Sequence, residues 1–150
     1  MYAIERANFE QDFNFIIASQ LEMALETEGL KLDPELLHAG VKSVFDDSSK
    51  ALYFVAKKDS QTIASTMITF EWSDWRDKQV WWIQSVYVLA EFRGQGVFKA
   101  MYQYLKDKVR TDESLAGLRL YVDKTNTNAQ KVYHKLAMTN EHYEMFEWMK

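Results

Sequence analysis

Residues 86–99 read VYVLAEFRGQGVFK and lead from an apolar run, through a short loop with two glycines, into an amphipathic segment. The run predicts a buried strand and the amphipathic segment a helix. The backbone N–H groups of the loop and of the first helical turn then point at one small volume, where the helix dipole adds positive potential. Glycines 94 and 96 let the main chain approach an anion closely, and Arg93 and Lys99 supply charge. The stretch predicts a phosphate site, with a tight strand-to-helix turn as the alternative.

The chain before this stretch is predicted to hold three strands and two helices. Apolar residues recur at helical spacing from about residue 9 to residue 27. Asp33 and Pro34 form an N-cap and N1 pair, so a second helix begins there and ends in the polar run 46–49. The predicted strands cover residues 3–6, 52–57 and 62–72, and the last two pair as antiparallel neighbours.

The remaining elements include the strand that enters the glycine loop. Residues 80–89 are apolar on both alternating sets, as in a strand buried on both faces, although Gln84 and Ser85 interrupt the run. After it we expect a helix over 96–109, a strand over 118–123, a helix over 126–136 and a closing strand over 142–148. This order predicts an α/β (α+β) fold in which the strands over 80–89 and 118–123 are parallel within an otherwise antiparallel sheet.

Composition narrows the classes of protein. A chain of 150 residues, with 47% hydrophobic and 27% charged residues, predicts one domain spanning 1–150. The net charge of −4 and the lack of a basic cluster disfavour a nucleic-acid partner. The absence of cysteine excludes disulfides, thiolate metal sites and a cysteine nucleophile, and no other metal constellation is present. With no secretory segment and no apolar run of roughly 18 residues, we expect a cytoplasmic protein without a membrane partner.

Two motifs resemble those of the GNAT family of N-acetyltransferases. Arg93-Gly94-Gln95-Gly96-Val97-Phe98 is similar to motif A, and Asn126-x-x-Ala129-x-x-x-Tyr133-x-x-x-Ala137-Met138 is similar to motif B. The chain departs from the pattern at Phe98, where Gly or Ala is usual, and at Ala137-Met138, where Gly-Phe is common. The resemblance implies a GNAT fold: a mixed, mostly antiparallel sheet of about seven strands with a central splayed parallel pair, and four helices.

The resemblance also implies acetyl-CoA as co-substrate. The pantetheine arm would pair with the backbone of the strand before the loop, and the N–H of Val88 would polarise the thioester carbonyl. The backbone of the loop would hold the pyrophosphate, and Asn126 would contact CoA, cap its helix, or do both. The implied cofactor-binding residues are Val86, Tyr87, Val88, Arg93, Gly94, Gln95, Gly96, Val97, Phe98, Lys99 and Asn126.

Catalysis needs a proton donor for the thiolate and a proton acceptor for the amine. By its match to the family, Tyr133 is the expected general acid, with a core aromatic as the alternative reading. Glu71 is the candidate general base, directly or through water, with a solvated carboxylate at a strand end as the alternative. Many GNAT enzymes carry a glutamate on the strand where Trp82 and Gln84 stand in this sequence, and neither of these residues accepts a proton.

The acceptor is expected to be a primary amine, most simply a small molecule, that attacks directly within a ternary complex. Glu26 belongs to an acidic group near the end of the first helix, and Trp72 stands in a turn with a second Trp, so both are candidate substrate-binding residues. An ordinary solvated face is the alternative reading of the acidic group. A protein or peptide acceptor, a non-catalytic acyl-CoA sensor of the same fold and a homodimer also stay open.

Overall fold

The computed structural model describes residues 1–150, and its contacts divide the chain into two compact units. The N-terminal unit is Met1–Arg119 and the C-terminal unit is Leu120–Lys150. The N-terminal unit contains β1 (Ala3–Arg6), α1 (Phe9–Glu28), α2 (Pro34–Asp46), β2 (Leu52–Lys58), β3 (Gln61–Ser73), β4 (Lys78–Val88), a 3-10 helix (Ala90–Phe92), α3 (Val97–Thr111) and β5 (Leu115–Arg119). The C-terminal unit contains α4 (Thr127–Lys135).

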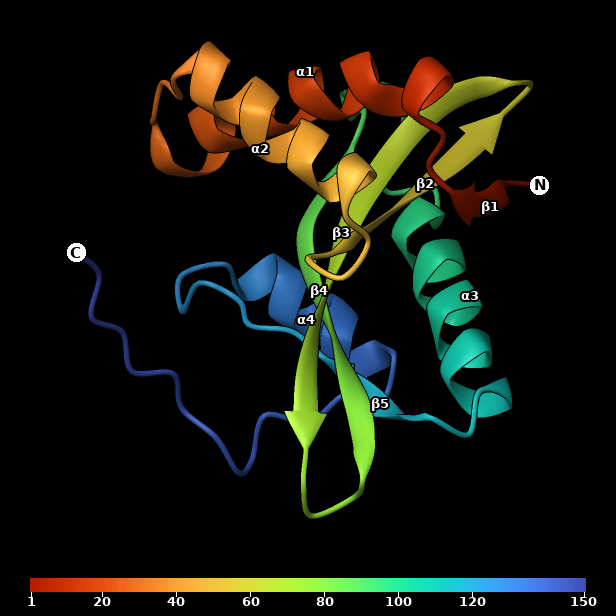
Figure 1. Ribbon diagram of the computed structural model, residues 1–150, viewed down its shortest axis with the longest axis vertical. Coiled ribbons are helices and arrows are strands. Elements are labelled where there is room, and N and C mark those ends of the chain that lie inside the picture. The colour runs from red at the N-terminus through yellow and green to blue at the C-terminus, as the bar shows by residue number, and fades with distance from the viewer. The chain divides into compact units, whose positions relative to one another are not determined.

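One mixed sheet forms the centre of the N-terminal unit (Figure 1). Its strands follow the chain in the order β1-β2-β3-β4-β5, antiparallel except for the parallel pair β4–β5. The turn between β2 and β3 has two residues, Asp59 and Ser60, with φ of 49° and 68°. Positive φ at both positions is what a type I′ hairpin turn requires, and its twist matches that of the flanking strands.

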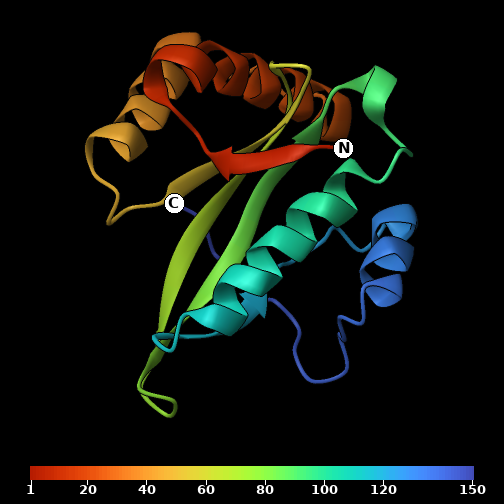
Figure 2. The same ribbon diagram turned by 90° about the vertical axis from the view of Figure 1, so that its right-hand side faces the viewer.

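The helices of the N-terminal unit cover opposite faces of this sheet (Figure 2). On one face, Ile16 of α1 and Val41 of α2 pack with Tyr53 of β2. On the other face, Met101 of α3 packs with Ala56 of β2. Tyr53 and Ala56 are three positions apart on one strand, so their side chains point to opposite faces.

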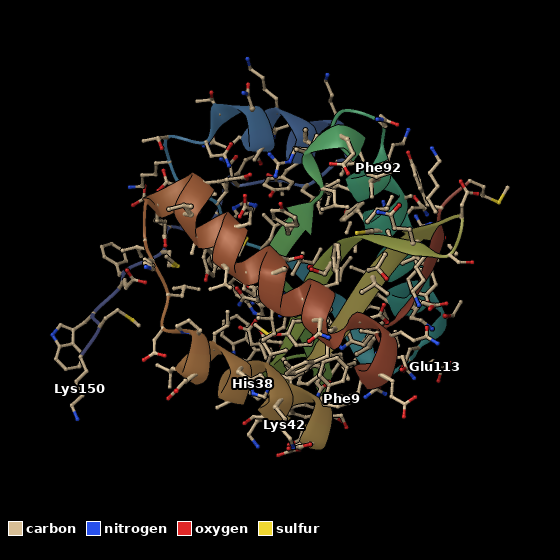
Figure 3. All side chains as sticks on the ribbon, turned by 90° about the horizontal axis from the view of Figure 1, so that it is seen from above. Phe9, His38, Lys42, Phe92, Glu113 and Lys150 are labelled. Atoms are coloured by element: carbon tan, nitrogen blue, oxygen red, sulfur yellow. The ribbon has the colours of Figure 1, made fainter.

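The first two helices begin where the sequence predicts. The side chain of Asn8 accepts hydrogen bonds from two N–H groups of the first turn of α1, and Asp33 does the same for α2, directly before its Pro34. Figure 3 shows the two helices side by side, with Phe9 on α1 and His38 on α2. Aromatic rings join them to each other through the contacts Phe9–Phe45 and Phe13–His38, and to the sheet through Phe45–Tyr53.

The fifth strand starts earlier than predicted. Asp112 accepts hydrogen bonds from the N–H and the hydroxyl of Ser114, which makes a tight turn directly after α3. The N–H of Gln79 then donates to the carbonyl of Ser114 at 2.9 Å, so pairing with β4 begins at Leu115. The strand expected over 118–123 therefore covers 115–119.

The number of strands also differs from the prediction. The structure has five strands in place of about seven, and β5 is the last strand of the sheet, so the parallel pair lies at its edge. Residues 142–148 form no strand, although their apolar and polar residues alternate in part. Alternation alone does not make a strand, because the backbone also needs a neighbouring strand to pair with. The prediction of four α-helices is confirmed.

Candidate active site

A β-bulge lies in the middle of β4, where the sequence shows Gln84 and Ser85. Ser65 of β3 pairs with Tyr87 and Met67 pairs with Gln84, so two β4 residues stand opposite the single residue between them. Ser85 has a φ of 51°, and the hydroxyl of Thr66 donates to the carbonyl of Gln84 at 2.9 Å. The bulge bends the strand just before the segment that enters the glycine loop.

Beyond the bulge, β4 is paired on one side only. Its parallel ladder with β5 covers Gln79 to Trp82, and residues 83–88 have no partner strand on that side. The N–H of Leu89 donates to the carbonyl of Ile63 on β3 at 2.9 Å. Because successive backbone groups of a strand point in opposite directions, the N–H and C=O of Val88 face away from β3. The sequence predicted such an edge of exposed backbone for the pantetheine arm.

The glycine loop follows the expected geometry. Gly94 and Gly96 have φ of 73° and 81°, a conformation that other residues adopt only with strain. A Cβ placed on either glycine meets no atom within 4 Å, so both face open space. Tyr2 donates a hydrogen bond to the carbonyl of Gln95 at 3.2 Å and fastens the loop to the start of the chain (Figure 2).

The helix that follows the loop differs from the others at its first turn. Side chains cap α1, α2 and α4, whereas α3 begins at Gly96 without a side-chain cap. The N–H groups of Gly94, Gln95 and Gly96 make no hydrogen bond of standard geometry within the chain. A helix N-terminus with free donors and positive potential is suited to an anion such as a diphosphate. Lys99 lies exposed in the first turn of this helix.

The side chain of Arg93 is directed to α1 and to the end of β4. Its Nε donates to the carbonyl of Val88 at 2.8 Å, and its Nη2 lies 2.9 Å from Oε2 of Glu26. The guanidinium also lies over the ring of Tyr87, 5.4 Å from its centroid. Burial, the largest influence, and the charge of Glu26 raise the pKa of Tyr87. The structure therefore brings together Glu26 and Arg93, which the sequence assigned to separate roles.

Glu71 is held in an ion pair on the sheet. Its two oxygens lie 2.9 and 2.7 Å from Nη1 of Arg119, and Nε1 of Trp82 donates to Oε2 at 3.0 Å. Burial raises the pKa of Glu71, but the hydrogen bonds from Trp82 and Arg119, together with the positive charge, outweigh burial and lower it. No pattern in the sequence indicates Arg119, because its pairing with Glu71 depends on the register of β5.

The predicted acceptor residue Trp72 lies at the far end of β3, where it pairs with Gln79. Its side chain is 61% exposed, and Trp75 in the adjoining turn is 91% exposed. The turn thus places two indoles on the surface.

The C-terminal unit carries the second motif. Asn126 caps α4 by accepting a hydrogen bond from the N–H of Ala129 at 3.1 Å. Burial raises the pKa of Tyr133, which keeps the phenol protonated at neutral pH. After the helix, Ala137 has a φ of 61° and the N–H of Met138 donates to the carbonyl of Tyr133 at 3.1 Å. Ala137 thus adopts the left-handed conformation that usually favours glycine.

Two other features are absent from residues 1–150. No group of three or more His, Cys, Asp or Glu side chains is arranged to hold a metal ion. None of the helices combines the length and the apolar character needed to cross a membrane.

The chain is similar to known acetyltransferases. Residues 16–138 match the model of the acetyltransferase (GNAT) family. A solved structure of a possible acetyltransferase from Clostridium difficile 630 is 39% identical, with a TM-score of 0.92, over 100% of this chain and 98% of that chain. Among curated proteins, no match was found.

Two more distant solved structures share the fold. A predicted acetyltransferase with acetyl-CoA from Clostridium acetobutylicum is 16% identical, with a TM-score of 0.72, over 98% of this chain and 96% of that chain. An aminoglycoside acetyltransferase from an uncultured soil metagenomic sample, in complex with sisomicin, is 16% identical, with a TM-score of 0.75, over 99% and 97%. The family match covers most of the chain and includes both motifs. The chain therefore belongs to the GNAT family and is an acetyl-CoA-dependent N-acetyltransferase.

Proposed function

We propose that the chain, acting as one domain, transfers the acetyl group of acetyl-CoA to the primary amine of a small molecule by direct attack in a ternary complex. The observation that carries this proposal is the uncapped N-terminus of α3, which follows the single-sided end of β4 after the 3-10 helix and the glycine loop. Free loop donors suit a diphosphate, and an exposed strand edge suits the amide-bearing pantetheine arm. Along the chain the exposed strand edge comes first and the loop donors follow, which matches the adjoining pantetheine arm and diphosphate of acetyl-CoA.

The candidate residues have different roles in the proposed acetyl transfer. The amine nitrogen bonds to the acetyl carbon, the C–S bond breaks, and the N–H of Val88 donates to the carbonyl oxygen as negative charge develops on it. Tyr133 gives its phenolic proton to the departing thiolate. Because the ion pair makes Glu71 a weak base, we assign the removal of the amine proton to a water molecule ordered by Glu71. Asn126 and Lys99 are proposed CoA contacts, and Trp72 is a proposed acceptor contact.

A screen of amines tests the proposed class of acceptor. Purified protein and acetyl-CoA would be combined with small amines, including an aminoglycoside such as sisomicin because one fold relative was solved with it. A parallel set would contain peptides with a free N-terminus or lysine. Release of free thiol above the amine-free rate with a small amine supports the proposal. Release only with peptides would assign a protein acceptor, and no release with either set would favour a non-catalytic acyl-CoA sensor.

A further inference from the structure

The end of β4 is held by a side chain from the next segment of the chain. Val88 has a pairing partner only on β3, Ala64. Because the N–H of the next residue, Leu89, donates to β3, the carbonyl of Val88 faces the side without a neighbouring strand. Nε of Arg93 donates to this carbonyl at 2.8 Å. The bond replaces the missing ladder hydrogen bond at the point where the strand leaves the sheet.

Arg93 is itself fixed by two groups from other elements. Its Nη2 meets the carboxylate of Glu26 on α1 at 2.9 Å, and its guanidinium lies over the ring of Tyr87. The planar fork of arginine makes both hydrogen bonds at once, which the single ammonium of lysine does not reproduce. The side chains of Arg93 and Glu26 are 44% and 39% exposed. An ion pair this exposed adds little to the free energy of unfolding. Its main effect is therefore on the orientation of the groups that Arg93 contacts.

We propose that Arg93 is a positioning residue, held by Glu26 and Tyr87, which fixes the end of β4 so that the N–H of Val88 keeps one direction. In an extended strand the N–H and C=O of one residue project from the same edge, so a restraint on the Val88 carbonyl also restrains this donor. Stabilisation of a developing oxyanion depends on donors that are aimed before the reaction. The inference rests on the proposed function, in which Val88 donates to the thioester carbonyl.

Two other roles for the pair make different predictions. If Arg93 binds the diphosphate, its loss raises the KM for acetyl-CoA and has no effect on a donor that lacks the diphosphate. If Glu26 binds the acceptor, its loss raises the KM for the amine alone. If Arg93 positions Val88, its loss lowers polarisation of the thioester carbonyl with either donor.

The experiment measures the infrared band of a ¹³C-labelled acetyl carbonyl bound to the protein, because a hydrogen bond to this oxygen lowers its frequency. The donors are acetyl-CoA and S-acetylpantetheine, which has no diphosphate. The variants are Arg93→Gln, Arg93→Lys and Glu26→Gln. The matched control is Arg110→Gln, which removes an arginine from another exposed ion pair, 3.5 Å from Asp107 on α3.

We expect a lowered band in the wild type and in the Arg110→Gln control. Arg93→Gln should lose most of this shift with both donors, and Arg93→Lys and Glu26→Gln should lose part of it. The kcat for free-thiol release should fall about tenfold in Arg93→Gln, below the roughly 10²- to 10³-fold cost of removing an oxyanion donor outright.

Three results would overturn the inference alone: an unchanged band in Arg93→Gln, a defect confined to the KM for acetyl-CoA, or a defect of Glu26→Gln confined to the KM for the amine. A wild type that shows neither a bound band nor turnover would overturn the proposed function, and the inference with it.

Discussion

The carboxylate of Glu71 meets a single nitrogen of Arg119 with both of its oxygens, at 2.9 and 2.7 Å. An ion pair of this kind leaves Glu71 charged at neutral pH and able to order a water molecule. We expect Glu71→Gln to lower kcat for acetyl transfer about tenfold, less than the roughly 10²- to 10⁴-fold typical of losing a direct acid or base. Turnover of the variant with the amine found by screening measures this effect.

Glu5→Gln is the matched control, since it removes a carboxylate 2.6 Å from Lys57 at the other edge of the sheet. Equal turnover of the Glu71 and Glu5 variants would show that Glu71 is structural only. Because the pKa of Glu71 is lower in the folded chain, its pair stabilises the fold fully above the usual glutamate pKa. This contribution is lost as pH falls through the lowered value, so the difference in unfolding free energy between wild type and Glu71→Gln should shrink on acidification.

Tyr133→Phe tests the proposed general acid. The ring remains, so the fold and most of the affinity for CoA should be kept. At pH 7 we expect turnover to fall roughly 10²-fold, at the low end for loss of a general acid. The loss should shrink as pH rises toward the thiol pKa of roughly 8 to 9, because the thiolate then leaves without a proton. Turnover equal to the wild type from pH 6 to pH 9 would remove Tyr133 from catalysis.

The substitution Asp12→Ala tests how much the attachment of α1 to the sheet contributes to the free energy of unfolding. Its fully buried carboxylate accepts hydrogen bonds from the N–H of Asn8 at 2.8 Å and from the hydroxyl of Thr62 at 2.7 Å, and it lies 3.5 Å from Nζ of Lys57. Asp12→Ala leaves these partners without an acceptor, and we expect it to lower the free energy of unfolding by roughly 3 kcal/mol. Urea denaturation measures the change.

The matched control is Asp46→Ala, which removes the exposed partner of Lys42 on α2. Its cost should stay below about 1 kcal/mol. Equal losses in the Asp12 and Asp46 variants would contradict a special role for the buried carboxylate.

Ala137 departs from the glycine that is common at its motif position, and its φ of 61° is unfavourable for any residue with a Cβ. Ala137→Gly should therefore raise the free energy of unfolding by about 0.5 to 1 kcal/mol. Ala39→Gly is the same substitution within the helix α2, where it should instead cost about 1 kcal/mol. A destabilised Ala137→Gly variant would mean that the left-handed conformation is not strained there.

The sequence was sufficient to predict those parts of the fold that depend on residues close together in the chain. The Asp33-Pro34 pair marks the start of α2, and the glycine loop marks the passage from β4 to α3. The bulge was not predicted, although it lies where Gln84 and Ser85 interrupt an apolar run. Caps and turns depend on neighbouring residues, and the pattern of those residues is visible in the chain itself.

Contacts between distant parts of the chain could not be predicted in this way. Glu71 and Arg119 are 48 positions apart, and Glu26 and Arg93 are 67 apart. Both pairs depend on strand register and on the direction in which a helix crosses the sheet, which side-chain periodicity does not fix. The early start of β5 has the same cause, because its pairing with Gln79 decides where the strand begins.

Calorimetric titration of acetyl-CoA into the wild type, Gly96→Val and Gly29→Val tests the cofactor site most directly. Both glycines have positive φ, 81° and 62°, and a Cβ at either meets no atom within 4 Å, so the two substitutions carry a similar backbone strain. Only Gly96 lies at the start of α3, where valine would fill the space assigned to the diphosphate. We predict a Kd on the order of micromolar to sub-millimolar for the wild type and for Gly29→Val, with no measurable binding to folded Gly96→Val. Equal affinity of folded Gly96→Val and wild type would contradict a CoA site at this loop.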